Sequence, residues 1–193
     1  MLKRLQLIIL ISASICVTQA QTVQSKYRLL VYGLPNFLRQ NAEDVIANKW
    51  GIEFYPVGDC STPREIADSA EKHNTVAKAR IAKKYGRDWS KRFDKEVDAE
   101  FARQQQITAW VESLDYVKKK KEQMEANGEL FFNLLTPVPH THKYDVQIRG
   151  WEKYQGEDIF FRFYRFEVDY KTKHIKLISD KMEKQREKRY IEE

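Results

Sequence analysis

From residue 62 onward, the spacing of apolar residues changes once, near Asn127 and Gly128, and this change limits the folds available to the chain. From residue 62 to that point, apolar side chains recur every three or four residues, as they do on one face of a helix. Beyond it they alternate with polar side chains, as in strands with one buried face. Helices and strands are therefore segregated along the sequence, which predicts the α+β class.

The residues before the helical region predict a β-α-β unit. Strands are expected at 26–32 and at 51–57, where short apolar runs are rich in β-branched and aromatic residues. Between them, 36–49 has apolar residues at helical spacing, with Asn36 expected as the N-cap. The length of this helix suits a crossover between parallel strands.

The first central helix has a clear start signal. Thr62 is expected as its N-cap, Pro63 as its first residue and Glu65 at the third position, which together form a capping box. Its buried face is predicted from a row that ends before Gly86 and comprises Ile66, Ala70, His73, Ala77, Ile81 and Tyr85.

A second helix and a shorter third are expected to follow, giving two to three central helices. In the second, a four-residue step predicts the buried row Trp89, Phe93, Val97, Phe101 and Gln105, continuing toward Leu114. The third is basic, runs through Lys118–Lys121 and is expected to end at Asn127-Gly128.

Antiparallel strands are expected in the C-terminal third. Tyr144, Val146 and Ile148 alternate with polar residues. Within 159–170 the apolar side swaps near Tyr164, which predicts a bulge or strong twist. A turn then leads to 174–178, where Ile175 and Leu177 are expected to point inward. We expect a single α+β domain over 21–180, with 181–193 as a charged tail that frays or forms a loose helix.

Residues 1–20 have the parts of a secretory signal peptide. Lys3 and Arg4 precede a short apolar run, and Ala20 ends the segment. We expect cleavage after Ala20 and export to the periplasm or medium, with no transmembrane span left after signal removal. The alternatives are a lipoprotein signal using Cys16, which has Ile15 where a small residue is preferred, and an uncleaved anchor.

The net charge of the mature chain limits the classes of partner that are expected. Loss of Lys3 and Arg4 lowers the basic residues from 34 to 32 against 28 acidic ones, leaving a net charge of +4. This modest charge is spread along the chain, and export separates the protein from nucleic acid, so nucleic acid is not expected as a partner. The partner is expected to be a protein or another envelope component.

Two stretches resemble a known family. "NKWGIEFYPVGDC" (48–60) and "IAKKYGRDW" (81–89) are similar to the FEKKY domain-containing proteins, small exported bacterial proteins named after a Phe-Glu-Lys-Lys-Tyr run. Here that run is Ile81-Ala82-Lys83-Lys84-Tyr85, so its first two residues depart from the name. The resemblance covers roughly 26–100 and implies export and a shared fold, with no catalytic residues. The residues themselves indicate a helix end, with cations in the last turn, an anchoring aromatic and a left-handed cap at Gly86.

Cys60 is the first candidate for chemistry. A nearby helix N-terminus and Arg64 favour a thiolate, but the chain has no C-x-x-C partner and no Cys-x₅-Arg loop. Free cysteines are among the most buried residues, so we expect Cys60 to be a buried small side chain, with a reactive or intermolecularly paired thiol as the alternative.

His140 and His142 are the second candidate. An H-x-H pair on an extended segment places both imidazoles on one side, as in some zinc and copper sites. The spacing fixes no third ligand, so solvated loop histidines are the favoured interpretation and no metal or other cofactor is expected. His73, on an apolar helix face, is expected to be a hydrogen-bonded core or rim residue.

The segment FFRFYRF (160–166) interleaves aromatic residues with Arg162 and Arg165. Such strips stack on sugars or bases in some proteins, but at strand spacing half of the side chains belong to the core, so we favour packing.

The motifs of the common hydrolase, zinc protease, P-loop and dinucleotide-binding classes are absent from the sequence, and no catalytic residue is assigned. The sequence favours an exported, non-catalytic protein with a binding or structural role in the cell envelope. The alternative is a thiol- or metal-dependent enzyme or sensor that uses Cys60 or the His140/His142 pair.

Overall fold

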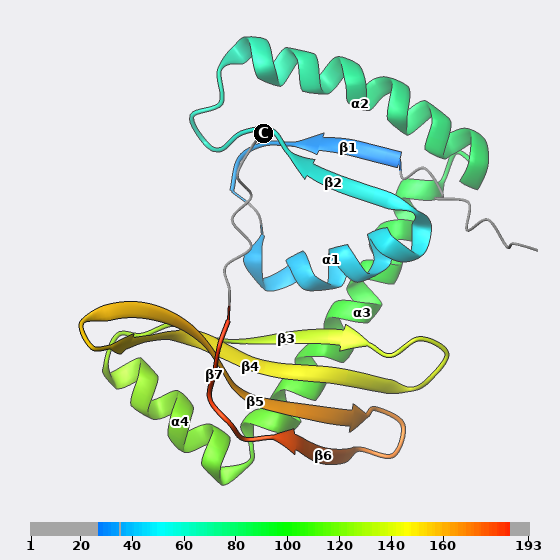
Figure 1. Cartoon of the computed structure of the whole chain (residues 1–193). Coiled ribbons are helices and arrows are strands. Elements are labelled where there is room, and N and C mark those ends of the chain that lie inside the picture. Colours follow the sequence, from blue (N-terminus) through cyan, green and yellow to red (C-terminus); the bar gives the residue numbers. More distant parts are fainter. Residues whose placement is uncertain (1–26, 35, 186–193) are drawn as a thin grey trace, which may run out of the picture.

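The N-terminal part of the chain forms the expected β-α-β unit (Figure 1). The computed structural model describes residues 27–34 and 36–185, so the proposed signal peptide lies outside the described residues. Strand β1 (Tyr27–Val31) pairs in parallel with β2 (Ile52–Pro56), and α1 (Phe37–Trp50) connects them. Gly51 adopts φ 66° and ends α1, which lets β2 begin at the next residue.

Helix α2 (Arg64–Tyr85) lies on the other side of β1 and β2 from α1 (Figure 1). The predicted capping box at its start is wrong. Pro63 occupies the N-cap position, and the Thr62 hydroxyl donates to the Asp59 carbonyl at 2.6 Å instead of capping the helix. The Asp59 side chain accepts from the backbone and hydroxyl of Ser61, so a separate turn before the helix engages these residues.

The C-terminal end of α2 is anchored as its sequence indicates. The Tyr85 ring packs on Trp50 with centroids 4.8 Å apart, and its hydroxyl donates to the Trp50 carbonyl. Gly86 has φ 94° but ψ 163°, so it is not the left-handed helical cap that was expected.

Helix α3 (Trp89–Glu112) joins two hydrophobic cores. Its first half contributes Phe93 and Val97 to the core formed with α1, α2, β1 and β2. Its second half contributes Ile107 and Val111 to the core under the C-terminal sheet. At 1.5 Å per residue the helix is about 36 Å long, enough to reach through both.

The C-terminal sheet is antiparallel, as predicted, and has the strand order β3-β4-β5-β6. Its strands are β3 (Phe131–Pro137), β4 (Lys143–Tyr154), β5 (Glu157–Asp169) and β6 (His174–Ser179). Tyr144, Val146 and Ile148 are buried and alternate with more exposed residues, which confirms the predicted period. Helix α3 and the short α4 (Asp115–Ala126) supply the side chains that pack on this face.

The predicted bulge in β5 is present. Tyr164 pairs with Ile148 and Arg162 with Arg149, so Phe163 is an extra residue between two paired positions. The extra residue lets Phe161, Phe163 and Phe166 all be buried, although strict alternation would place Phe163 and Phe166 on opposite faces.

Two expectations for the chain end need correction. Ile175 packs against the core, but Leu177 is 43% exposed rather than buried. Residues Glu183–Lys184 form a short strand, β7, that pairs with β5, so the start of the charged tail is neither frayed nor helical. An ion pair of 2.5 Å between Arg162 and Glu183 holds it there. Residues 186–193 lie outside the described residues.

None of the helices within residues 27–34 and 36–185 has the length and apolar character that crossing a membrane requires.

Candidate functional site

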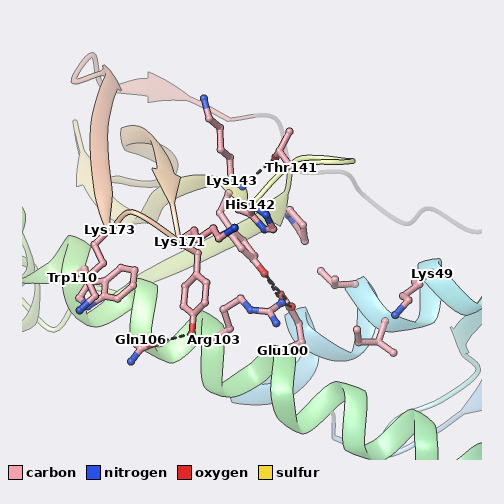
Figure 2. A pocket seen from close by; sticks show the side chains of 15 residues that line it. Lys49, Glu100, Arg103, Gln106, Trp110, Thr141, His142, Lys143, Lys171 and Lys173 are labelled. Atoms are coloured by element: carbon pink, nitrogen blue, oxygen red, sulfur yellow. Dashed lines mark hydrogen bonds and ion pairs between the residues drawn. The ribbon is translucent and has the colours of Figure 1, made fainter.

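A cavity of about 620 Å³ lies where α1 and α3 meet two turns of the C-terminal sheet (Figure 2). One turn joins β3 to β4 and supplies Thr141 and His142; the other joins β5 to β6 and supplies Lys171 and Lys173. The cavity therefore collects side chains from both halves of the molecule. Its basic side chains are Lys49, Arg103, Lys143, Lys171 and Lys173.

Glu100 of α3 is the acidic residue that lines the cavity, and it is only 4% exposed. Its carboxylate accepts hydrogen bonds from Arg103 Nη1 at 2.8 Å, Gln104 Nε2 at 2.9 Å and the Tyr144 hydroxyl at 3.0 and 3.1 Å. Burial raises the pKa of Tyr144 to about 12, so its phenol is a stable proton donor at neutral pH. With its oxygens engaged by three side chains, Glu100 is placed to hold α3 against β4.

The polar cluster continues from Glu100 to α1 and β3. Asn41 Nδ2 donates to Gln104 Oε1 at 3.0 Å and to the Leu135 carbonyl at 2.8 Å. One amide thus ties α1 to α3 and to the sheet, behind the cavity. Because buried polar groups are costly when unpaired, this network fixes how the two halves meet.

The sequence prediction missed Glu100 and Gln104 as buried residues. The predicted row in α3 moved in steps of four through Phe101 to Gln105, but each such step turns 40° beyond a full circle. The observed row alternates steps of four and three and stays on one side of the helix; it comprises Phe93, Val97, Glu100, Gln104, Ile107 and Val111. Gln105 is exposed. A search for a row of residues that repeats every 3.5 positions would have found the observed row from the sequence.

Aromatic side chains form one end of the cavity. Trp110 of α3 stacks on Tyr170 with ring centroids 5.6 Å apart and planes at 27°. The Tyr170 hydroxyl donates to Gln106 at 2.9 Å, and its backbone N–H donates to the His142 carbonyl at 2.9 Å. These contacts fix the two turns relative to each other and to α3, so the wall is ordered before any ligand enters.

The charges around the cavity do not cancel. Lys49 pairs with Glu96 at 2.9 Å and Lys143 with Glu167 at 2.8 Å, while Arg103 pairs with Glu100. Within the described part of the chain, the ammonium groups of Lys171 and Lys173 have no carboxylate partner, although the Lys171 backbone N–H donates to Asp169 at 2.9 Å. The Lys173 ammonium lies 5.8 Å from the centre of the Trp110 ring. Figure 2 shows the turn that carries Lys171 facing Glu100 and Arg103 on α3. The cavity therefore presents excess positive charge to a ligand.

His140 and His142 do not form the geometry that the sequence prediction assumed. The segment is a tight turn rather than an extended strand: Thr141 N–H donates to the Val138 carbonyl, and His140 has φ 60°. Both imidazoles are exposed, and only His142 lines the cavity. In the described residues, no group of three or more His, Cys, Asp or Glu side chains is placed to hold a metal ion.

Cys60 is exposed with a free thiol, so the prediction that it is buried is wrong. It lies in the turn closed by Asp59, Ser61 and Thr62, four residues before α2 begins. Strand β2 ends at Pro56, before this turn, so Cys60 does not share the buried position of Ile52 at the start of that strand. The reactive-thiol hypothesis remains a prediction.

The other two candidate features have structural roles, as expected. In the 160–166 segment, Phe161, Phe163 and Phe166 are core residues, while Arg165 pairs with Asp145 at 2.6 Å on the opposite face. His73 lies at the rim, where its Nε2 donates to the Arg28 carbonyl at 3.1 Å.

The fold and the cavity together define a small α+β protein with a cationic, aromatic-walled site between two cores. No family model, curated protein or solved structure matches the chain.

Proposed function

We propose that this protein is a non-catalytic binding protein of the cell envelope, and that the cavity between α1, α3 and the two turns binds an anionic ligand. The observation that carries the proposal is the pair Lys171 and Lys173, two ammonium groups without carboxylate partners in the described chain, beside a cavity of about 620 Å³. Export to the envelope follows from the proposed signal peptide and from the family resemblance.

The arrangement favours binding over catalysis because its polar groups are already engaged. The Glu100 carboxylate receives hydrogen bonds from three side chains, and Tyr144 holds its proton with a pKa raised to about 12 by burial. A general base needs a free lone pair facing the substrate, and a nucleophile needs an adjacent base. The two lysines instead provide fixed positive charge, which suits a carboxylate, phosphate or sulfate group.

Calorimetric titration tests this proposal with pyrophosphate and citrate as separate probes at low salt. We expect saturable binding of at least one probe, weakened by added salt because the contributing charges are close to solvent. The double variant Lys171→Gln/Lys173→Gln should lower affinity about tenfold.

A matched control removes the same charge elsewhere. Lys118→Gln/Lys119→Gln alters two exposed lysines of α4, which do not line the cavity, and should change affinity less than twofold. Equal losses in the two double variants, or no binding of either probe, would contradict a site at this cavity.

A further inference from the structure

The two-stranded sheet of β1 and β2 has two edges, and α2 closes only one of them. At β1, Asn74 Nδ2 donates to the Leu30 carbonyl at 2.7 Å and Asn74 Oδ1 accepts from Leu30 N–H at 2.8 Å. His73 Nε2 donates to the Arg28 carbonyl on the same edge. Side chains of α2 thus take the place of a neighbouring strand and protect this edge.

The outer edge of β2 is left without such partners. Tyr27 N–H donates to the Gly51 carbonyl, and Val57 N–H donates to the Val31 carbonyl. In a parallel ladder with this register, the odd-numbered residues of β2 face β1, so Ile52 and Phe54 direct their backbone groups away from it. Ile52 is only 1% exposed, so Phe54 is the accessible position on this edge. Within the described residues, no hydrogen bond reaches these outward groups.

A cavity of about 820 Å³ follows this open edge. It is lined by β2 residues including Phe54, by Asp44 of α1 and by Ile66 at the start of α2. A second cavity, of about 390 Å³, shares Phe54 and reaches the carboxyl end of β1. Large apolar side chains are exposed around the two cavities, among them Tyr32 (42%), Leu34 (75%), Tyr55 (44%) and Ile66 (43%). Such a gathering of exposed apolar surface is typical of a protein interaction site.

The charge of this edge is opposite to that of the cationic cavity. Among the described residues, the side chains lining the two edge cavities include Glu43, Asp44, Glu53 and Asp59 and no Lys, Arg or His. Arg28 pairs with Glu53 at 2.9 Å, and within the described residues Asp44 and Asp59 have no basic partner. Although Arg39 lies 3.8 Å from Glu43, the balance remains negative.

We infer that the outer edge of β2 binds an extended, basic segment of a partner protein, which adds as a third strand to the β1–β2 sheet. Main-chain hydrogen bonds to Phe54 supply the pairing, and alternate apolar side chains of the segment contact the exposed apolar residues. Lysine or arginine side chains at the intervening positions of the segment form ion pairs with the acidic residues that line the two cavities. This site lies apart from the cationic cavity and takes a different class of partner, so it goes beyond the proposed function.

The experiment uses the mature chain and the synthetic peptide acetyl-Lys-Val-Lys-Val-Lys-Val-amide, followed by backbone amide hydrogen exchange in NMR spectra. In the free protein, the Tyr55 amide should be protected by β1 while the Phe54 amide exchanges faster. Saturating peptide should slow exchange at Phe54 at least tenfold and leave Tyr55 unchanged. A peptide N-methylated at alternate residues should bind at least tenfold more weakly, because it loses donors along one edge.

Charge is tested with a pair of double variants. Glu43→Gln/Asp44→Asn should weaken peptide binding about threefold, whereas Glu122→Gln/Glu125→Gln on the exposed face of α4 should have less than a twofold effect. Binding of the Glu-Val analogue as tightly as the Lys-Val peptide would overturn the proposal. So would protection at β6 or β7 in place of Phe54, an unchanged affinity after N-methylation, or absence of binding at millimolar peptide.

Discussion

The Tyr144 phenol donates to both oxygens of the Glu100 carboxylate, at 3.0 and 3.1 Å, and so links β4 to α3 beside the cationic cavity. Arg103 Nη1 donates to the same phenol oxygen at 3.1 Å. Burial and the neighbouring carboxylate both act against ionisation of the phenol, and burial is the larger effect. The protonated form of Tyr144 is therefore part of the folded structure.

This contact predicts a loss of stability in strong alkali. Because the pKa of Tyr144 is raised from 10.0 to about 12 on folding, its contribution is fully present below pH 10 and is lost as the pH rises toward 12. The expected loss is about 2–3 kcal/mol, measured by denaturant unfolding across this range. The Tyr144→Phe variant should be less stable at pH 7 and should show a shallower decline. An equally steep decline in the variant would assign the effect to other groups.

The hydrogen bonds of Asn74 to the edge of β1 predict that this side chain stabilises the fold. Asn74→Ala leaves the Leu30 N–H and carbonyl without their side-chain partner, and should lower the free energy of unfolding by about 1–2 kcal/mol. Lys78→Ala changes an exposed residue of the same helix and should have an effect within about 0.5 kcal/mol. Equal stability of the two variants would show that water replaces the amide without cost.

Gly150 is predicted to be intolerant of any side chain. A Cβ atom there would lie 2.1 Å from the Leu130 carbonyl oxygen and 2.6 Å from Met124 Cε. Gly150→Ala should therefore destabilise the protein by about 2–4 kcal/mol, because the backbone of one element would have to move. At Gly33, with φ 89° and open space around it, alanine should cost only about 1 kcal/mol. Thermal unfolding of both variants checks the comparison, and a Gly150→Ala protein as stable as Gly33→Ala would contradict it.

The exposed position of Cys60 predicts rapid labelling of the native protein. A disulfide reagent such as Ellman's should modify this thiol fully at neutral pH without denaturant. If labelling requires unfolding, the side chain is not accessible as the structure places it. Comparison with Cys60→Ser in ligand titrations then tests the thiol-dependent alternative, for which we expect no change in affinity.

The proposed signal peptide predicts the mass of the mature protein. Intact-mass analysis of the exported chain should find Gln21 as its first residue. Added lipid on Cys16 would instead identify a lipoprotein, and a mass beginning at Met1 would identify a retained anchor.

The broad architecture was predictable because it depends on periodicity. The alternation of Tyr144, Val146 and Ile148 and the swap of apolar side near Tyr164 both correspond to observed features of the sheet. Local rules were less reliable where two hydrogen-bonding options compete. The Thr62 hydroxyl could cap a helix or close a turn. It donates to the nearby Asp59 carbonyl, so it closes the turn.

The candidate site was not predictable in the same way. Lys171 and His142 belong to different turns, and Trp110 and Glu100 to different turns of α3, so their proximity depends on tertiary packing. The pairing of Asn74 with Leu30 joins residues 44 positions apart and leaves no periodic signal. Exposed lysines in turns are common, and only the surrounding cavity distinguishes these from others.

Helix α3 contributes to both hydrophobic cores, and this has a consequence for how the chain unfolds. The hydrophobic core of each half is incomplete without residues from α3. Melting of either half therefore removes support from the other, and the two halves should lose structure in a single cooperative transition. A protease cut within α3 would accordingly abolish both halves together rather than release one of them intact.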